Sequence, residues 1–196
     1  IKYRGPDDQG IIFFDDSDHS IKLGHRRLSI IDLSNRGHQP MISDRKSVLI
    51  FNGEIYNHNI IRKTINDKVK VAWKSQSDTE VLLYFLENFD TEFVLNNIEG
   101  MFSFCFYNNL KKEIILARDL AGEKPLYIQT DSNFISFSSD IKSLSSFSGY
   151  EKKINHNSLK DYLKYSYIPN PNSIFENIFK LPPGSYLTIN TNNFVS

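Results

Sequence analysis

The stretch Phe51-Asn52-Gly53-Glu54-Ile55-Tyr56-Asn57 decides how this chain is interpreted, and it follows an apolar run at 48–50. The apolar run predicts a buried strand that ends before Asn52. The Asn52 amide can donate a hydrogen bond, and Gly53 lets its backbone N–H approach a ligand closely because it has no Cβ. Donors aimed at one point form an oxyanion hole. Asn-Gly is also a common two-residue hairpin turn, so the pair alone leaves a tight turn as the alternative.

Charged residues elsewhere in the chain complete a candidate pocket for a free amino acid. The Arg27 guanidinium can hold an α-carboxylate through two parallel hydrogen bonds. Asp78 stands in the first turn of a predicted helix, where it can pair with an α-ammonium that Glu54 shares. Asn52 and Gly53 would then receive the side-chain carbonyl of the ligand. Taken singly, Arg27 is compatible with a surface charge and Asp78 with a favourable place at the helix dipole.

Composition excludes several classes of protein. Lysine and arginine number 23 and aspartate and glutamate 23, which gives no reason to expect a nucleic-acid or membrane partner. We expect neither a membrane span nor a signal peptide. The single cysteine rules out an internal disulfide and favours a reducing, cytoplasmic location. The histidines lack ligand spacing, so no metal is expected.

The first half of the chain predicts short strands and two helices. Apolar runs at 10–14, 21–24 and 28–31 predict strands joined by tight connections. Isoleucines at helical spacing after Tyr56 predict a helix that stops at Asn66-Asp67. Ser77-Asp78-Thr79-Glu80 has the pattern of a capping box, with serine at the N-cap and glutamate three residues later, and it predicts the next helix.

The second half predicts two hairpins and a separate C-terminal segment. The hairpins join 101–107 to 114–117 and 126–128 to 134–137, and a short helix is expected at 140–146. A polar segment at 147–157 divides the chain into a domain of residues 1–150 and a segment of residues 151–196. The second part is expected to hold a helix at 158–165, a proline-fixed loop at 168–172 and a last strand after 181–187. Few helices between runs of strands indicate an α+β fold with mostly antiparallel sheet.

Sequence blocks along most of the chain resemble one family. They occur in the order Arg4-Gly5-Pro6-Asp7, Gly24-His25-Arg26-Arg27-Leu28-Ser29-Ile30-Ile31-Asp32-Leu33, Gly37-His38-Gln39-Pro40-Met41, Phe51-Asn52-Gly53-Glu54-Ile55-Tyr56-Asn57, Ser77-Asp78-Thr79-Glu80-Val81, Gly100-Met101-Phe102, Ala117-Arg118-Asp119 and Gly122-Glu123-Lys124-Pro125-Leu126-Tyr127. The chain resembles the class II glutamine amidotransferase domain of glutamine-hydrolysing asparagine synthetases from Tyr3 to about Leu187. Tyr167-Ile168-Pro169 and Lys180-Leu181-Pro182-Pro183-Gly184 resemble the family's bridge toward its synthetase domain.

The resemblance implies a four-layer αββα sandwich of the N-terminal-nucleophile hydrolase type. It implies that L-glutamine is bound by Arg27, Ile30, Ile31, Asn52, Gly53, Glu54 and Asp78, with Asn52 and Gly53 as the oxyanion hole. The turn at Arg118-Asp119 and the segment Lys124-Pro125 are expected to be structural. Ammonia would pass to a C-terminal synthetase domain that uses ATP and Mg²⁺ to amidate aspartate. The glutamine amidotransferase domain itself is expected to need no cofactor. A homodimer is compatible with this architecture.

The chain departs from the family at its nucleophile. The family uses a cysteine at the mature N-terminus whose own α-amine acts as the base. Here the chain opens at Ile1, so we expect a piece of a longer protein that lacks this cysteine, the first strand and the first helix. Cys105 lies within an apolar strand, on the face opposite the neighbouring phenylalanines, without a group that would lower its pKa. We therefore expect no glutamine hydrolysis by the 196 residues themselves.

Two alternatives stay open at this point. The chain can be a pseudo-amidotransferase without a nucleophile, which serves as a binding module. It can also belong to a related amidotransferase that acts on an acceptor other than aspartate, because the acceptor is chosen outside this domain.

Overall fold

The computed structural model describes residues 2–15, 20–131, 134–144 and 152–191. Its centre is a five-stranded antiparallel sheet in the order β10 (Tyr186–Asn190), β6 (Glu113–Arg118), β5 (Gly100–Asn108), β4 (Val48–Ile55) and β3 (Met41–Ile42). A two-stranded antiparallel sheet consists of β1 (Asp8–Asp15) and β2 (Ser20–Arg27). A three-stranded antiparallel sheet has the order β8 (Ile135–Ser138), β7 (Tyr127–Thr130) and β9 (Ile178–Lys180).

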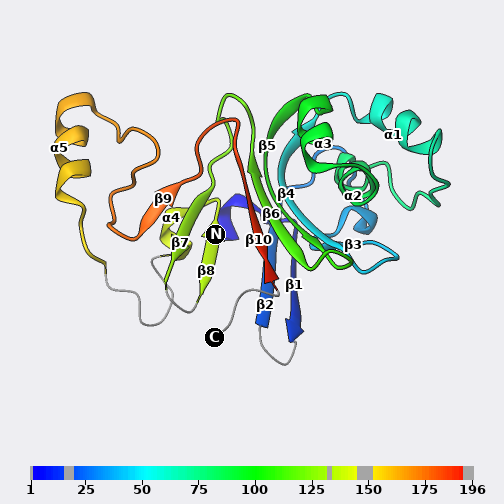
Figure 1. Cartoon of the computed structure of the whole chain (residues 1–196), viewed down its shortest axis with the longest axis horizontal. Coiled ribbons are helices and arrows are strands. Elements are labelled where there is room, and N and C mark those ends of the chain that lie inside the picture. Colours follow the sequence, from blue (N-terminus) through cyan, green and yellow to red (C-terminus); the bar gives the residue numbers. More distant parts are fainter. Residues whose placement is uncertain (1, 16–19, 132–133, 145–151, 192–196) are drawn as a thin grey trace.

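Helices cover one side of the large sheet, and the smaller sheets cover the other. Figure 1 shows α1 (His58–Asn66), α2 (Asp78–Asn88) and α3 (Thr91–Asn97) together on one side of β4 and β5. The sheet of β7, β8 and β9 lies on the opposite side with α4 (Ile141–Leu144), and α5 (His156–Tyr165) lies beyond it. Short 3₁₀ turns occur at η1 (Lys2–Arg4) and η2 (Asn35–Gly37). The expected α+β sandwich with antiparallel sheets is confirmed.

Alternation along β4 and β5 divides the core into two layers. The phenylalanines at 102, 104 and 106 face α1 and α2, together with Leu49 and Phe51 of β4. Cys105 and Ile50 face the other way, toward Leu23 of β2 and Ile128 of β7. Side chains pack against both faces of β4 and β5 and bury most of the two strands, which therefore form a firm base for the polar groups described below.

The predicted end of the central strand was wrong. Strand β4 continues through Asn52 and Gly53 to Ile55, because β5 pairs with it along its whole length, Asn52 opposite Ser103 and Gly53 opposite Phe102. The alternative of a hairpin turn at Asn52-Gly53 is therefore also wrong. Gly53 has φ of +157°, and a Cβ at this position would lie 2.1 Å from the carbonyl oxygen of Met101. Glycine is thus required at this point by the close approach of β5.

The apolar run at 28–31 is a loop and not a strand. Strand β2 passes through the basic cluster and ends at Arg27, and Leu28 and Ile30 are 56% and 64% exposed. The Arg27 guanidinium donates to the carbonyl oxygens of Ser34 (2.9 Å) and Asp32 within this loop. Side-chain hydrogen bonds to the backbone thus replace strand pairing as the source of order in the loop.

The capping box at the start of α2 is only half formed. Ser77 is the N-cap, and its Oγ accepts from the N–H of Thr79 at 3.0 Å. The Glu80 carboxylate does not return to the N-cap and instead accepts from the N–H groups of Lys74 and Ser75, both at 2.8 Å. Glu80 therefore fixes the segment that leads into the helix.

The remaining predicted elements are confirmed where the structure describes them. Helix α1 ends at Asn66 as expected, and both predicted hairpins are present as β5–β6 and β7–β8. Helix α5 begins at His156, two residues earlier than expected, because the Asn155 side chain caps it. The turn at 132–133, part of the helix expected at 140–146 and most of the predicted boundary near residue 150 lie outside the described residues. No helix in the described part is long and apolar enough to cross a membrane.

Candidate functional site

A cavity of about 250 Å³ opens along the edge of β4 that β3 leaves uncovered. It brings together the end of β2, the loop after it, the second half of β4 and the first turn of α2. Every residue predicted from the sequence to bind a ligand lines it: Arg27, Ile30, Ile31, Asn52, Gly53, Glu54 and Asp78. The structure thus gathers the predicted residues in one place, and their roles toward a ligand stay predictions.

The backbone of β4 presents a row of polar groups to this cavity. The N–H of Phe51 donates to Gln39 Oε1 at 2.7 Å, and the N–H of Ile55 donates to Asp78 Oδ2 at 2.9 Å. Antiparallel alternation turns the N–H of Gly53 to the same side, between these two satisfied positions. Its counterpart on β5, Phe102, accordingly bonds to Asp119 rather than to β4. The Gly53 N–H is therefore available to a ligand.

A second donor lies directly beside Gly53. The Nδ2 atom of Asn52 is buried and has no hydrogen-bond partner among the described residues. Buried polar groups without partners are rare in folded proteins, and leaving one unpaired costs about 1–3 kcal/mol. Adjacent unpaired donors of this kind have the arrangement of an oxyanion hole.

Asp78 supplies a buried carboxylate beside the end of β4. It is 5% exposed, and its Oδ1 accepts from the N–H of Thr79 at 2.9 Å while Oδ2 accepts from Ile55. Burial raises the pKa of Asp78 above its ordinary value, although these backbone donors oppose the shift, and the nearby carboxylate of Glu54 raises it further. An arriving cation would stabilise this pair of carboxylates in their ionised form.

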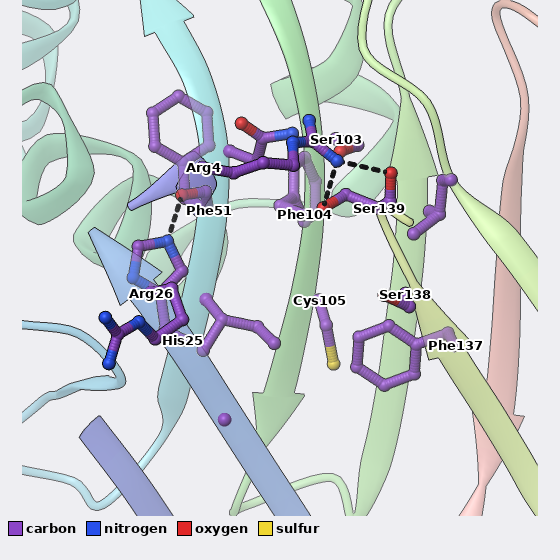
Figure 2. Close-up of a pocket in the computed structure, with 14 residues that line it drawn as sticks. Arg4, His25, Arg26, Phe51, Ser103, Phe104, Cys105, Phe137, Ser138 and Ser139 are labelled. Atoms are coloured by element: carbon purple, nitrogen blue, oxygen red, sulfur yellow. Dashed lines mark hydrogen bonds between the residues drawn. The ribbon is translucent and has the colours of Figure 1, made fainter. Parts of the chain in front are cut away.

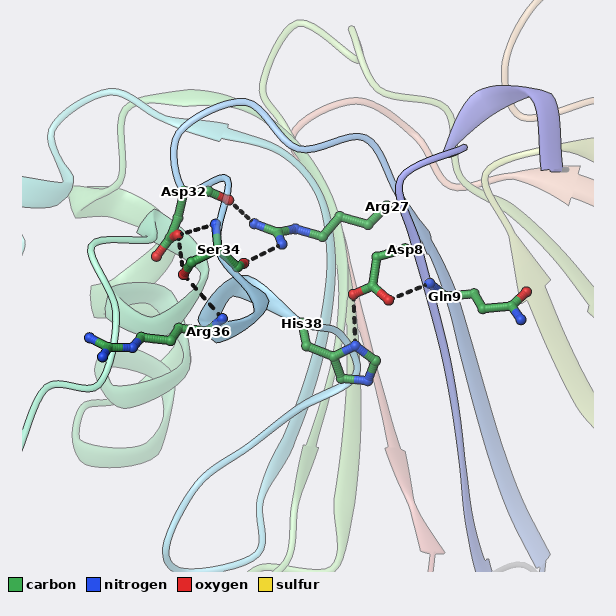
Figure 3. Close-up of polar contacts among 7 residues, drawn as sticks. All are labelled: Asp8, Gln9, Arg27, Asp32, Ser34, Arg36 and His38. Atoms are coloured by element: carbon green, nitrogen blue, oxygen red, sulfur yellow. Dashed lines mark hydrogen bonds and ion pairs between the residues drawn. The ribbon is translucent and has the colours of Figure 1, made fainter.

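Arg27 has fewer N–H donors left for a ligand than its place in the sequence suggests. Its side chain is 8% exposed, and two of its N–H groups are used by the loop carbonyls, as Figure 3 shows. Gly37 packs directly against the guanidinium, since a Cβ there would lie 2.0 Å from Nη2. A guanidinium carries five N–H donors, so Arg27 can hold the loop and still present donors to the cavity.

The loop that carries Ile30 and Ile31 is tied down at several points. Asp32 Oδ1 accepts from the N–H and the hydroxyl of Ser34, and Oδ2 accepts from the N–H of Gln76 at 3.3 Å. These hydrogen bonds, led by that of the Ser34 hydroxyl, lower the pKa of Asp32. The loop is thereby joined to the segment that precedes Asp78.

A second group of polar contacts joins the same region to β1. Asp8 Oδ2 lies 2.7 Å from His38 Nδ1, and Asp8 Oδ1 accepts from the N–H of Gln9 (Figure 3). His38 stands next to Gln39, whose side chain accepts a hydrogen bond from the N–H of Phe51 in the middle of β4. The walls of the cavity are thus connected through side chains as well as through the backbone.

A smaller cavity of about 140 Å³ lies between the sheets, on the other side of Asn52. Figure 2 shows His25 from β2, Phe104 and Cys105 from β5, and Phe137 from β8 around it. Cys105 is 1% exposed, and burial raises the pKa of its thiol. The prediction that Cys105 is a packed side chain is confirmed, and a buried thiol with a raised pKa is poorly suited to act as a nucleophile.

Sequence reasoning assigned no role to several residues that line the larger cavity. Gln39 and His25 each bond to the backbone of Phe51, and Met101, Thr79 and Lys124 also line the wall. Gln39 and His25 stand inside sequence blocks of the family resemblance, which is the signal that could have found them. The sequence predicts a structural role for Lys124, as it does for Arg118 and Asp119.

The structural role of Arg118 and Asp119 is confirmed. Arg118 donates to the carbonyl oxygens of Lys124, Gly122 and Leu181 at 2.6 to 2.8 Å. Burial acts to raise the pKa of Asp119, but the backbone N–H groups that donate to its carboxylate together lower it below its ordinary value. The turn is therefore held as one unit, with Lys124 at the edge of the cavity.

Comparison with known proteins shows which family this chain matches. A family model described as "Glutamine amidotransferase domain" matches residues 1–196. The chain is 35% identical to asparagine synthetase 1 (glutamine-hydrolyzing) of Bacillus subtilis, over 96% of this chain and 29% of that protein. It is 40% identical to asparagine synthetase B (glutamine-hydrolyzing) of Escherichia coli, over 68% of this chain and 23% of that protein. The chain thus spans less than a third of the length of each of these relatives.

A solved structure shows the same fold. The allosteric regulatory enzyme of purine biosynthesis superposes with a TM-score of 0.58 and 19% identity, over 87% of this chain and 33% of that one. At this identity the likeness concerns the fold alone. It supports the α+β sandwich expected from the sequence.

Proposed function

Because the chain belongs to the glutamine amidotransferase domain family, we propose that it binds L-glutamine and forms the glutamine-hydrolysing domain of an asparagine synthetase. The observation that carries this proposal is the unpaired Nδ2 of Asn52 beside the Gly53 N–H, in the same cavity as the charged residues Arg27 and Asp78. A free amino acid has one carboxylate, one ammonium and, in glutamine, one carbonyl. The cavity offers a complementary group for each.

The proposed binding mode assigns one role to each wall. The remaining donors of Arg27 hold the α-carboxylate, with help from the backbone of Ile30 and Ile31. Asp78 and Glu54 hold the α-ammonium, whose charge relieves the burial cost of the Asp78 carboxylate. The side-chain carbonyl then points at Asn52 and Gly53.

The proposed reaction follows from that placement. A cysteine thiolate attacks the side-chain carbonyl carbon, and Asn52 with Gly53 stabilises the negative oxygen of the tetrahedral intermediate. The C–N bond breaks and ammonia leaves with a proton from the nucleophile's base. Water then hydrolyses the thioester, and glutamate is released. Cys105 is the one cysteine of the sequence, and its burial separates it from the substrate, so the proposal assigns the thiol to a residue outside these 196 positions.

The relatives support the remaining parts of the proposal. Both are much longer than this chain and carry the name asparagine synthetase, so we assign to the parent protein a C-terminal synthetase domain that amidates aspartate. ATP and Mg²⁺ belong to that domain, and none of the roles above requires a cofactor here. The proposal places the protein in the cytoplasm.

Calorimetric titration of the protein with L-glutamine tests the binding proposal. Glutamine should bind to the wild type, and Asp78→Ala should weaken binding at least about tenfold because it removes a charge-assisted contact. Asp90→Ala is the matched control, because Asp90 caps α3 through the same kind of hydrogen bond and does not line the cavity. If the wild type does not bind glutamine, the proposal is wrong.

A second test separates the enzyme from a binding module without a nucleophile. The gene upstream of the codon for Ile1 should encode a cysteine directly after an initiator methionine. A stop codon before any cysteine would favour the binding module. In the full-length enzyme, Asp78→Ala should abolish glutamine-dependent synthesis and leave ammonia-dependent synthesis largely intact.

A further inference from the structure

Two of the buried polar atoms without partners belong to residues that line the same cavities. Within the described residues, these unpaired atoms are His25 Nδ1, Asn52 Nδ2, Arg62 Nε and Ser158 Oγ. His25 and Asn52 both line the larger cavity and also the smaller one behind it. Unpaired buried groups are costly, and two that belong to the wall of one cavity point to a ligand that satisfies both.

The protonation of His25 follows from its hydrogen bond. Nε2 lies 3.1 Å from the carbonyl oxygen of Phe51. A carbonyl oxygen only accepts hydrogen bonds, so Nε2 carries the proton. Burial, the largest cause, lowers the pKa of His25 to about 4, and the ring is therefore neutral at pH 7. Nδ1 is then an unprotonated acceptor, buried and without a donor to accept from.

A buried acceptor beside a buried donor matches one chemical group in particular. A primary carboxamide has a carbonyl oxygen that accepts and an NH₂ group that donates. Asn52 Nδ2 and the Gly53 N–H suit the oxygen, and His25 Nδ1 suits the NH₂ group. Phe51, to which His25 is bonded, directly precedes Asn52 on β4, which places the imidazole next to these donors.

We propose that His25 is a specificity-determining residue, whose Nδ1 accepts a hydrogen bond from the side-chain NH₂ of bound glutamine while Asn52 and Gly53 donate to its carbonyl oxygen. This inference rests on the proposed function, since it names the group that distinguishes the substrate. Glutamate lacks the NH₂ donor, and its carboxylate oxygen would meet the lone pair of Nδ1. The same contact holds the leaving nitrogen in a fixed orientation before the C–N bond breaks.

A ligand with the same shape and no N–H tests the contact. L-2-Amino-5-oxohexanoate replaces the NH₂ of glutamine by CH₃ and keeps the carbonyl group. Calorimetric titration should show that the wild-type protein binds L-glutamine about tenfold more tightly than this ketone, as expected for one buried hydrogen bond. In His25→Gln the preference should fall to about twofold or less, through weaker binding of glutamine and with little change for the ketone.

The variant is chosen to preserve the fold. Glutamine at position 25 carries an N–H donor that can replace Nε2 toward Phe51, but it has no acceptor at the place of Nδ1. His58→Gln is the matched control, because His58 also bonds to a backbone carbonyl of β4, that of Ile55 at 2.8 Å, and does not line either cavity. This control should keep the tenfold preference.

The outcomes separate the inference from the function on which it rests. If wild type binds glutamine and the ketone equally well, or if His25→Gln keeps the full preference, the role of His25 is wrong and the glutamine site stands. If wild type binds neither ligand, the proposed function itself is wrong. Should His25→Gln fail to give a cooperative thermal transition, equal binding of the two ligands by the wild type would still overturn the role of His25.

Discussion

Replacing His25 by glutamine should make the protein less sensitive to mild acid. Burial lowers the pKa of His25 from 6.5 to about 4 in the folded state, whereas in the unfolded chain the ring titrates near its ordinary value. Between these values the unfolded state binds one more proton than the folded state. The contribution of neutral His25 to the free energy of unfolding is thus complete above pH 6.5 and is lost as the pH falls toward 4.

The size of this effect follows from the two pKa values. For a single group with pKa 6.5 unfolded and about 4 folded, linkage predicts a loss of about 2 kcal/mol between pH 7 and pH 5, and about 3 kcal/mol by pH 4. The charged groups that act on His25 are Arg27 on its own strand, Asp8 on β1 and His38 in the loop after η2. All of them remain in the variant, so the difference between the two proteins isolates His25.

Urea unfolding at intervals between pH 4 and pH 7 measures this difference. The free energy of unfolding should fall more steeply with acid in wild type than in His25→Gln. His156→Gln, which removes an exposed histidine at the start of α5, should follow the wild-type curve. If the curves of wild type and His25→Gln run parallel, His25 is not a buried neutral group. The proposal that its Nδ1 accepts a hydrogen bond from glutamine would then be wrong.

Further substitutions probe the other walls of the cavity. Asp78→Asn should lower the free energy of unfolding by about 1–3 kcal/mol in urea, because the amide can accept only one of the two backbone hydrogen bonds now received by the carboxylate; an unchanged midpoint would contradict this. Gly53→Ala should cost about 1–3 kcal/mol in the same assay, since its Cβ meets the Met101 carbonyl at 2.1 Å and its φ is +157°; a fully stable variant would mean that β5 can shift. In the full-length enzyme, Asn52→Ala should lower glutaminase turnover by roughly 10²–10³ with little change in the KM for glutamine, and a near-normal rate would remove Asn52 from the oxyanion hole.

Local patterns were sufficient for much of the fold. The isoleucines of α1, the Ser77 cap of α2 and the alternation along β5 each concern residues close in sequence, and the structure confirms them. The family blocks also led to the residues that line the larger cavity, although the roles proposed for them await experiment.

Predictions failed where a distant partner overrides the local pattern. Asn52-Gly53 has the composition of a turn, yet β5 extends β4 across it. The apolar run after Arg27 has the composition of a strand, yet no neighbouring strand pairs with it and the guanidinium orders it as a loop. The strand partner and the side-chain anchor both come from the assembled structure.

The sequence by itself determined the family, the α+β class and the identity of the side chains proposed to hold glutamine. Only the tertiary structure decided that the Gly53 N–H stays open while Gln39 and Asp78 occupy its neighbours, and that His25 keeps an unpaired Nδ1 in the cavity wall that it shares with Asn52. His25 and Gln39 reach Phe51 across 26 and 12 positions of sequence. A hydrogen bond forms or fails according to a few tenths of an ångström, and packing of the sheets sets these distances. The Asn52-Gly53 pair therefore becomes a site only when the strands around it are in place.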